Sequence, residues 1–244
     1  MRKYRTIALT LPLVLAFTAF FVGSKPNDNE QTSRTNSASA RSQKRKIDIN
    51  QFPIAEFGNS QAPDAKRKDR GRKRDNSDWA VSPDAVSDST VRVDGVDLTL
   101  PAFPVEKAGA VVIGGVTDGK AYLSNDQTGV YSSFVVTVEE ILKNPGKLKV
   151  GSPIEVEREG GRVRFPSGRV HLYLLSEQDM PHAGGRYVFF LSKTDYDSVF
   201  EIITAYEIRG NLIYPLDELP QARKYEGASA SAFLQELKTN LSDP

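Results

Sequence analysis

Short apolar runs separated by Gly, Pro, Asn and Asp make up the sequence from Ala108 onward, and this rhythm constrains the fold more than any other feature. The runs are rich in Val, Ile, Tyr and Phe, which favour β-strands. Strands are expected at 110–117, 133–138, 153–157, 169–175, 186–192, 199–208 and 211–216. The sequence therefore predicts a mainly β domain with its core over 108–218.

Alternation within the runs predicts which side chains face the interior. Ile154 and Val156 alternate with Glu155 and Glu157, which predicts one buried and one solvent-exposed face for this strand. Two runs have an expected buried face, formed by Phe134, Val136 and Val138 in the first and by Phe200, Ile202, Tyr206 and Ile208 in the second.

Two glycine pairs mark breaks in the strands. Gly114-Gly115 interrupts a buried run and predicts a bulge or sharp bend. Gly160-Gly161 predicts a two-residue hairpin turn. In that hairpin Glu159 faces Arg162, Glu157 faces Arg164 and Val156 faces Phe165, so charged and apolar pairs fall into register together.

The stretch "SNDQTG" at 124–129 contains residues that favour a turn between two strands. Asn125 and Asp126 can satisfy local backbone groups, and Gly129 can take a positive φ. The same oxygen atoms are candidates for gripping a cation or a sugar. One carboxylate falls short of the ligand count of a calcium loop, so the turn is the favoured interpretation.

Both ends of the predicted domain have their own signals. At the start, "VRVDGVDLTLPAF" over 91–103 indicates a short hairpin at Asp94-Gly95 or an extended arm laid on the domain. At the end, a helix over 229–241 is predicted from apolar residues at helical spacing, with Ser229 or Ser231 as a possible N-cap. These apolar residues are Phe233, Leu234, Leu237 and Leu241.

The N-terminus has the pattern of a secretory signal, because "MRKYR" precedes an apolar run of 18 residues that ends at small residues. Cleavage after Ser24 is expected. An uncleaved membrane anchor is the alternative, since the run approaches the roughly 20 residues that cross a bilayer. Either way residues 1–24 predict export, to the periplasm, the medium or the outer face of the cytoplasmic membrane.

Residues 25–90 are too polar to offset the entropy of ordering a backbone, so a disordered basic linker is expected there and the domain is expected over 91–244. Lys and Arg outnumber Asp and Glu by 14 to 12 over 25–105, whereas the balance is 15 to 19 over 106–244. The positive charge therefore lies in the linker.

Two basic clusters lie in this linker, "RSQKRK" at 41–46 and "KRKDRGRKR" at 66–74. They predict either a solvated tether or contact with an anionic polymer or lipid surface; nucleic acid is not an expected partner of a signal-bearing chain without interleaved aromatic residues. The cations of the second cluster are Lys66, Arg67, Lys68, Arg70, Arg72, Lys73 and Arg74. An apolar island between the clusters is a possible docking motif, formed by Ile47, Phe52, Ile54 and Phe57.

Candidate chemistry is sparse. The chain has no cysteine, which excludes disulfides, thiolate metal sites and a catalytic Cys. His171 and His182 could serve a metal-dependent or acid/base hydrolase, but their spacing is not the helical HExxH of a zinc site, and no GxSxG elbow occurs. We therefore expect no cofactor, no metal and no catalytic residues, and keep the hydrolase as an alternative.

The best binding candidates lie on the charged stretch from Glu155 to Arg169 and around the turn at 123–131. A soluble sheet face explains the same charges without a ligand. The candidate binding residues are Asn125, Asp126, Tyr131, Glu157, Arg162, Arg164 and Arg169.

A resemblance to known proteins is carried by "AYLSNDQTGVYSSFVVTVEEILKN", "IEVEREGGRVRFPSGR", "MPHAGGRYVFFLS", "ITAYEI" and "YPLD". These strings are similar to a group of uncharacterised exported bacterial proteins with a compact β domain, over about residues 108–218. The strand succession also resembles an OB-like barrel with a helix, although the disulfides common in exported netrin-like relatives are absent. The resemblance implies a fold and no activity.

The expected function is accordingly an exported, non-catalytic binding or scaffold module of the cell envelope. Its partner is expected to be an envelope protein or polymer. A second alternative makes the basic linker the active part, which ties the domain to an anionic polymer or lipid.

Overall fold

The structure is a computed structural model that describes residues 49–58, 65–77, 79, 81–82, 89–144, 146 and 148–242. The chain from Ile47 onward forms one compact unit. No helix in the described part of the chain is long and apolar enough to cross a membrane. The expected signal segment at 1–24 and the basic cluster at 41–46 lie outside the described residues.

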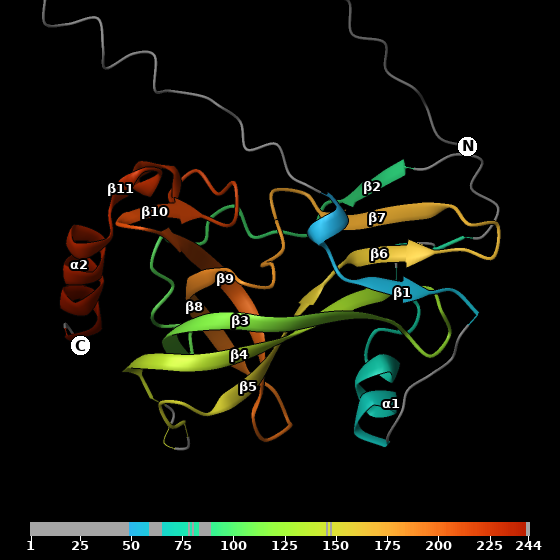
Figure 1. The fold of residues 1–244 in the computed structure, drawn as a ribbon, viewed down its shortest axis with the longest axis horizontal. Coiled ribbons are helices and arrows are strands. Elements are labelled where there is room, and N and C mark those ends of the chain that lie inside the picture. Colours follow the sequence, from blue (N-terminus) through green and yellow to red (C-terminus); the bar gives the residue numbers. More distant parts are fainter. Residues whose placement is uncertain are drawn as a thin grey trace, which may run out of the picture. The chain divides into compact units, whose positions relative to one another are not determined.

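The described chain is mainly β and ends in a helix (Figure 1). Its strands are β1 (Ile54–Glu56), β2 (Ser89–Val93), β3 (Ala110–Leu123), β4 (Val130–Lys143), β5 (Pro153–Glu159), β6 (Gly161–Arg164), β7 (Val170–Leu175), β8 (Arg186–Lys193), β9 (Val199–Arg209), β10 (Leu212–Pro215) and β11 (Ala228–Ser229). Its helices are α1 (Ala65–Arg72) and α2 (Ala230–Ser242), with 3-10 turns η1 (Ile49–Gln51) and η2 (Arg223–Tyr225). The strands expected from Ala108 onward and the C-terminal helix are confirmed.

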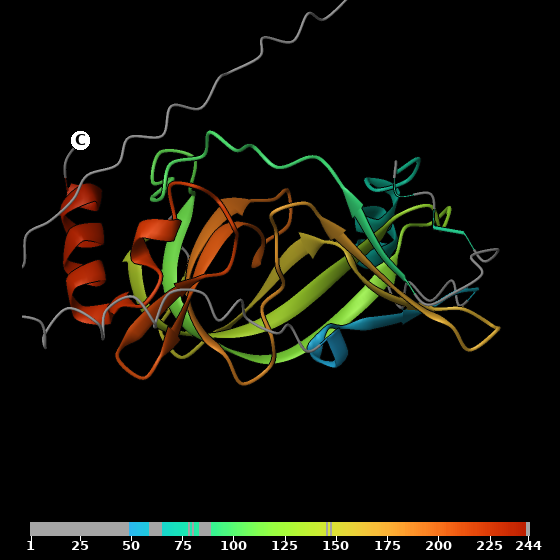
Figure 2. The same ribbon diagram turned by 90° about the horizontal axis from the view of Figure 1, so that it is seen from above.

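The strands form two sheets, ordered β11-β10-β9-β5-β4-β3-β8 and β1-β6-β7-β2. Strand β8 also pairs with β9, so the pairings β3–β4–β5–β9–β8 return to β3. Within this ring only β5 and β9 are parallel. A second sheet lies beside the ring, and the long strand β3 runs under both (Figures 1 and 2). The expected single small barrel therefore does not describe the whole unit.

The predicted hairpin at Gly160-Gly161 is wrong. Strand β5 pairs with β4 and β9, while β6 pairs with β7 and β1, so the chain changes sheets at this point. Both glycines have a positive φ, 99° and 142°. A Cβ on Gly160 would lie 2.5 Å from the carbonyl oxygen of Tyr173, so the close approach of the two sheets requires a glycine here.

The bulge expected at Gly114-Gly115 is confirmed, because the register of β3 against β4 shifts between Ile113 and Gly114. A second bulge was not foreseen. The register of β8 against β9 shifts where Phe190 pairs with Thr204 and Leu191 with Ile202. Ile203 is the extra residue, and it reverses the alternation along β9.

The core consists of three apolar clusters. Phe134, Val136 and Ile202 belong to the cluster formed by the ring, as expected. Tyr206 and Ile208 lie in a second cluster, which packs under α2 through Phe233 and Leu237. The expectation that Phe200, Ile202, Tyr206 and Ile208 share one face is therefore wrong, and the bulge at Ile203 is the reason. A third cluster, with Trp79, Val163 and Tyr173, lies against the smaller sheet.

The expected linker at 25–90 needs correction for the residues that the structure describes. Strand β1 pairs parallel with β6, and β2 pairs parallel with β7, so both edges of the smaller sheet come from this stretch. Phe52 and Ala55 are buried, at 4 % and 6 % exposed. Phe52, Ile54 and Phe57 of the apolar island thus belong to the domain, which starts before residue 91, while Ile47 lies outside the described residues.

The stretch that follows β2 is an extended arm and not a hairpin at Asp94-Gly95, since β2 has a parallel partner and no strand follows before β3. Leu100 and Phe103 are buried in the second apolar cluster. Tyr206 fixes the arm by donating its hydroxyl to the carbonyl oxygen of Ala102 at 2.6 Å.

Substitution of Gly160 tests the sheet-changing bend. Gly168 has a comparable φ of 84° but open space around it, so it is a matched control. Both Gly→Ala changes are expected to lower the free energy of unfolding by about 1–2 kcal/mol, because alanine is strained in the left-handed backbone conformation. We expect Gly160→Ala to lose about 1–3 kcal/mol more in urea unfolding, because its Cβ overpacks against Tyr173. Equal losses at the two sites would contradict the close approach.

A buried ion pair fixes the end of β5 to the chain beyond β10. Arg158 donates to both carboxylate oxygens of Asp217, at 2.7 and 2.9 Å, and each side chain is only 1 % exposed. Arg158 also donates to the carbonyl oxygens of Asp179 and Ile203, and Thr204 donates to Asp217. The pair therefore joins β5, β9 and two loops.

Removal of one partner of this pair leaves a buried charge. We expect Asp217→Ala to lower the free energy of unfolding by about 3–5 kcal/mol. The double variant Arg158→Met, Asp217→Leu contains no buried charge and is expected to lose clearly less in the same urea titration. A double variant as unstable as the single one would contradict this account of the pair.

Candidate functional site

Glutamate and tyrosine side chains gather on the outer face of the strand ring. In the register of β4 against β5, Tyr131, Ser133 and Val135 lie opposite Glu159, Glu157 and Glu155, so these side chains share the face that points away from the ring's core. Tyr122 of β3 pairs with Tyr131, and Glu201 of β9 pairs with Glu157. We call this set the acidic face: Tyr122, Tyr131, Ser133, Glu155, Glu157 and Glu201, with the loop residues Asp195 and Tyr196.

The basic segment, residues 65–77, lies on the acidic face. Arg70 Nη1 is 2.7 Å from Glu157 Oε1 and 3.0 Å from Glu155 Oε2. Arg67 Nη2 is 2.5 Å from Glu155 Oε1, and Arg74 Nη2 is 3.2 Å from Glu157 Oε2. Three arginines of the expected linker are thus held by two glutamates of strand β5.

The prediction of a solvent-exposed face on β5 is wrong at Glu157, whose side chain is 1 % exposed. Withdrawal of a carboxylate from water costs several kcal/mol unless cations and hydrogen bonds replace the water. Arg67, Arg70 and Arg74 supply both, and they are themselves 6–11 % exposed. Glu157 and the basic segment are therefore buried together, and neither is stable in this place without the other.

Glu155 stays ionised at neutral pH. Burial raises the pKa of Glu155, but the hydrogen bond from Ser133 and the charges of Arg67 and Arg70 outweigh it, so the pKa lies below its ordinary value. The acidic face thus presents a carboxylate at its edge, whereas at its centre burial outweighs the charges of the arginines and holds the pKa of Glu157 above its ordinary value.

Aromatic rings complete the contact. The guanidinium of Arg67 lies over the ring of Tyr122, 3.8 Å from its centroid, and that of Arg74 lies over Tyr131 at 4.3 Å. Such stacking favours the planar guanidinium over an ammonium group. At the loop between β8 and β9, Tyr196 donates to Asp69, and Lys73 forms an ion pair with Asp195.

The turn at 124–129 joins β3 and β4, as predicted, and it also holds the basic segment. Asn125 donates its amide to the carbonyl oxygen of Lys68 at 2.9 Å, and Asp126 Oδ2 accepts the backbone N–H of Asn76 at 2.6 Å. Burial opposes ionisation of Asp126, but this bond and those from Ser124 and Thr128 hold its pKa below its ordinary range. The oxygens proposed to grip a cation or a sugar bind the chain's own backbone.

The predicted binding residues fall into two groups. The structure brings Asn125, Asp126, Tyr131 and Glu157 together under the basic segment. Arg162 and Arg164 lie elsewhere, on β6, where Arg162 donates to the carbonyl oxygen of Phe52 and Arg164 to Glu56. Arg169 is exposed in the turn between β6 and β7. The proposed recognition face from Glu155 to Arg169 is therefore divided between two sheets.

The two histidines lie in different surroundings. His171 is buried on β7, and its ring packs against Phe165 and Tyr173. His182 lies 3.2 Å from Glu207 and has Tyr187 edge-on to its ring. Within the described ranges, no group of three or more His, Asp or Glu side chains is placed to hold a metal ion. The hydrolase alternative stays a prediction.

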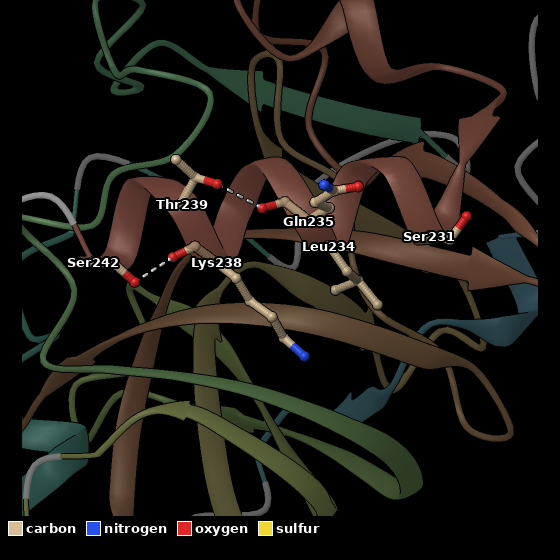
Figure 3. Close-up of a pocket in the computed structure, with 6 residues that line it drawn as sticks. All are labelled: Ser231, Leu234, Gln235, Lys238, Thr239 and Ser242. Carbon is tan, nitrogen blue, oxygen red and sulfur yellow. Dashed lines mark hydrogen bonds between the residues drawn. The ribbon is translucent and has the colours of Figure 1, made fainter.

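A hollow lies on the surface of α2 (Figure 3). The hydroxyls of Thr239 and Ser242 donate to carbonyl oxygens of their own helix, those of Gln235 and Lys238. Polar groups therefore do not converge on a ligand here. The residues that line the hollow are Ser231, Leu234, Gln235, Lys238, Thr239 and Ser242.

Sequence reasoning missed the arginines of the site. The signal was present as complementary charge, because the linker is net positive and the domain net negative. Arg67, Arg70 and Arg74 also follow one another at spacings of three and four residues, which places them on one side of a helix. At least five of the seven cations at 66–74 are ion-paired within the chain. An anionic envelope partner of this cluster stays a prediction.

Comparison with known proteins assigns this chain to no family. No protein-family model matches the chain, and no curated protein matches it. The resemblance to exported β-domain proteins therefore stays a prediction, and the function rests on the chemistry of the acidic face.

Substitution of Arg70 tests the docking of the basic segment. Arg72 is the matched control, because it lies on the same helix, has the same charge and is 68 % exposed. We expect Arg70→Ala to weaken docking by about 2–3 kcal/mol, less than for an isolated buried pair because Glu157 keeps two other arginines. Arg72→Ala is expected to change it by less than about 0.5 kcal/mol.

Limited trypsin digestion reports this difference, since each variant loses one cleavage site of the same segment. Faster cleavage within residues 65–77 is expected for Arg70→Ala alone, because cleavage follows the undocked population. Equal cleavage rates in the two variants would mean that Arg70 does not hold the segment.

Proposed function

We infer that the protein is an exported, non-catalytic binding or scaffold module of the cell envelope, and that the acidic face binds its ligand. The observation that carries this inference is the burial of Glu157 beneath three guanidinium groups. A face that desolvates a carboxylate and stacks tyrosines beside it is built to receive cations. Export rests on the sequence pattern of residues 1–24.

The strand order supports an OB-like barrel as the scaffold. The ring β3–β4–β5–β9–β8 has the five strands of that fold, with β5 and β9 as its parallel pair. OB-like barrels bind ligands on their second and third strands and on the loops that follow the first and fourth. The corresponding parts here are β4, β5, the turn at 124–129 and the loop at 194–198, and the basic segment contacts the last three and stacks on Tyr131 of β4.

The charge of the face determines the class of ligand. Nucleic acid and anionic lipid require Lys and Arg to replace released counterions. Here the outer face of β5 presents Glu155 and Glu157, with Glu201 beside them on β9. A cationic ligand is therefore favoured, and an envelope protein with exposed arginines or lysines fits the expected partner.

Affinity capture from a cell-envelope extract tests this function. The full chain is compared with Glu155→Gln, Glu157→Gln and with the matched pair Glu139→Gln, Glu140→Gln, whose exposed glutamates pair with Arg186 and Lys238 away from the acidic face. We expect the first double variant to lose a cationic partner that the wild type and the second variant retain. Equal capture by all three proteins would remove the acidic face as the binding site.

A further inference from the structure

We propose that the basic segment occupies the ligand site and can be displaced from it. The acidic face then binds an arginine-bearing polypeptide segment of another protein in the same place. The arginines of that segment would have the spacing of Arg67, Arg70 and Arg74. This inference rests on the function proposed above and specifies the class of partner.

The contacts of the three arginines define what the face recognises. Arg70 lies between Glu155 and Glu157 of β5, while Arg67 and Arg74 each stack on a tyrosine ring. An ammonium group satisfies the charge of Glu157 but not the stacking on Tyr122 and Tyr131. The face therefore selects arginine at positions 67 and 74, with a cation at position 70 between Glu155 and Glu157.

Three further contacts are made to the backbone of the segment and do not depend on its sequence, whereas those of Asp69, Lys73 and Asp75 involve its side chains. Asn125 donates to the carbonyl oxygen of Lys68, Asp126 accepts from the N–H of Asn76, and Thr128 accepts from the N–H of Ser77. A segment from another protein can offer the same groups. The turn at 124–129 can therefore form these three backbone contacts with another chain that supplies the arginines.

The segment has little tendency to be helical on its own. Helix α1 is eight residues long, has no acidic residue in its first turn and contains five cations and Gly71. Helices of this length are marginal in water, and like charges one turn apart repel. Its order therefore derives from the acidic face, and such weakly self-stable elements open without unfolding of the domain.

The fit of the segment to the face is incomplete. The Nε–H groups of Arg70 and Arg74 are buried and donate to no acceptor among the described residues, although these side chains are only 6 % and 10 % exposed. A hollow of about 470 Å³ lies beside the helix and includes Glu155 and Tyr196 in its lining. A partner whose arginines have acceptors for their own Nε–H groups, and whose other side chains fill this space, can replace the segment.

Fluorescence anisotropy with a labelled peptide of residues 65–77, AKRKDRGRKRDNS, tests the proposal. The full chain is compared with two triple variants. Arg67→Ala, Arg70→Ala, Arg74→Ala removes the internal competitor, and Lys66→Ala, Lys68→Ala, Arg72→Ala removes the same charge from the exposed side of the helix. We expect the first variant to bind the peptide at least about tenfold tighter than the wild type and the second variant, because occlusion of a site lowers its apparent affinity.

Two control peptides separate recognition from general charge attraction. A peptide with Lys at positions 67, 70 and 74 and a peptide of scrambled sequence have the same net charge. Each is expected to bind the first triple variant at least about tenfold more weakly than the native peptide. Equal binding of the three peptides, or no binding by a folded triple variant, overturns the proposal.

Trp79 provides a second readout that needs no substitution. It is the only tryptophan, lies two residues beyond the basic segment, and is 6 % exposed against Tyr173. Excess unlabelled peptide, which contains no tryptophan, is expected to change its fluorescence in the wild type with saturation. If the triple variant does not fold, absence of this change at saturating peptide overturns the proposal.

The two inferences fail in different ways. Loss of envelope capture on Glu155→Gln, Glu157→Gln together with failure of the peptide to bind leaves the proposed function standing and removes the arginine segment as its ligand. Equal capture of envelope proteins by the wild type and by Glu155→Gln, Glu157→Gln rules out the proposed function, irrespective of the result with the peptide.

Discussion

A desolvated carboxylate on the outside of a strand ring is the constraint on which the rest of this structure depends. Glu157 alternates with core residues and so must point outward, yet it is covered. An uncompensated charge in that position would cost several kcal/mol, so Arg67, Arg70 and Arg74 must accompany it. This explains why one of the most polar stretches of the chain is folded, and why its helix lies on β5 and the two neighbouring loops.

The path of the chain makes this arrangement possible. At Gly160 and Gly161 the chain leaves the ring and starts a second sheet, whose two edges then accept β1 and β2 from the N-terminal stretch. The N-terminal stretch is thereby anchored on both sides of α1. The ring, the second sheet and the basic segment form one unit because each buries a surface that the others would leave exposed.

Sequence alone predicts the local elements well and their partners poorly. Strands from Ala108 onward and α2 follow from period and composition, since these are properties of neighbouring residues. The hairpin at Gly160-Gly161 fails because a glycine pair permits both a tight turn and a change of sheet, and contacts distant in sequence decide between them. The bulge at Ile203 and the burial of Glu157 likewise depend on pairing between remote segments. The binding residues Asn125, Asp126, Tyr131 and Glu157 are near the site, whereas its arginines were assigned to a linker.

Backbone hydrogen exchange measured by mass spectrometry tests most directly whether buried glutamate holds the basic segment. In the wild type, the account predicts amides of residues 67–77 that exchange far more slowly than those of the free peptide. In Glu157→Gln the same amides are predicted to lose protection while β3, β4 and β5 keep theirs. Exchange of residues 67–77 at the rate of the free peptide in the wild-type chain would contradict the account.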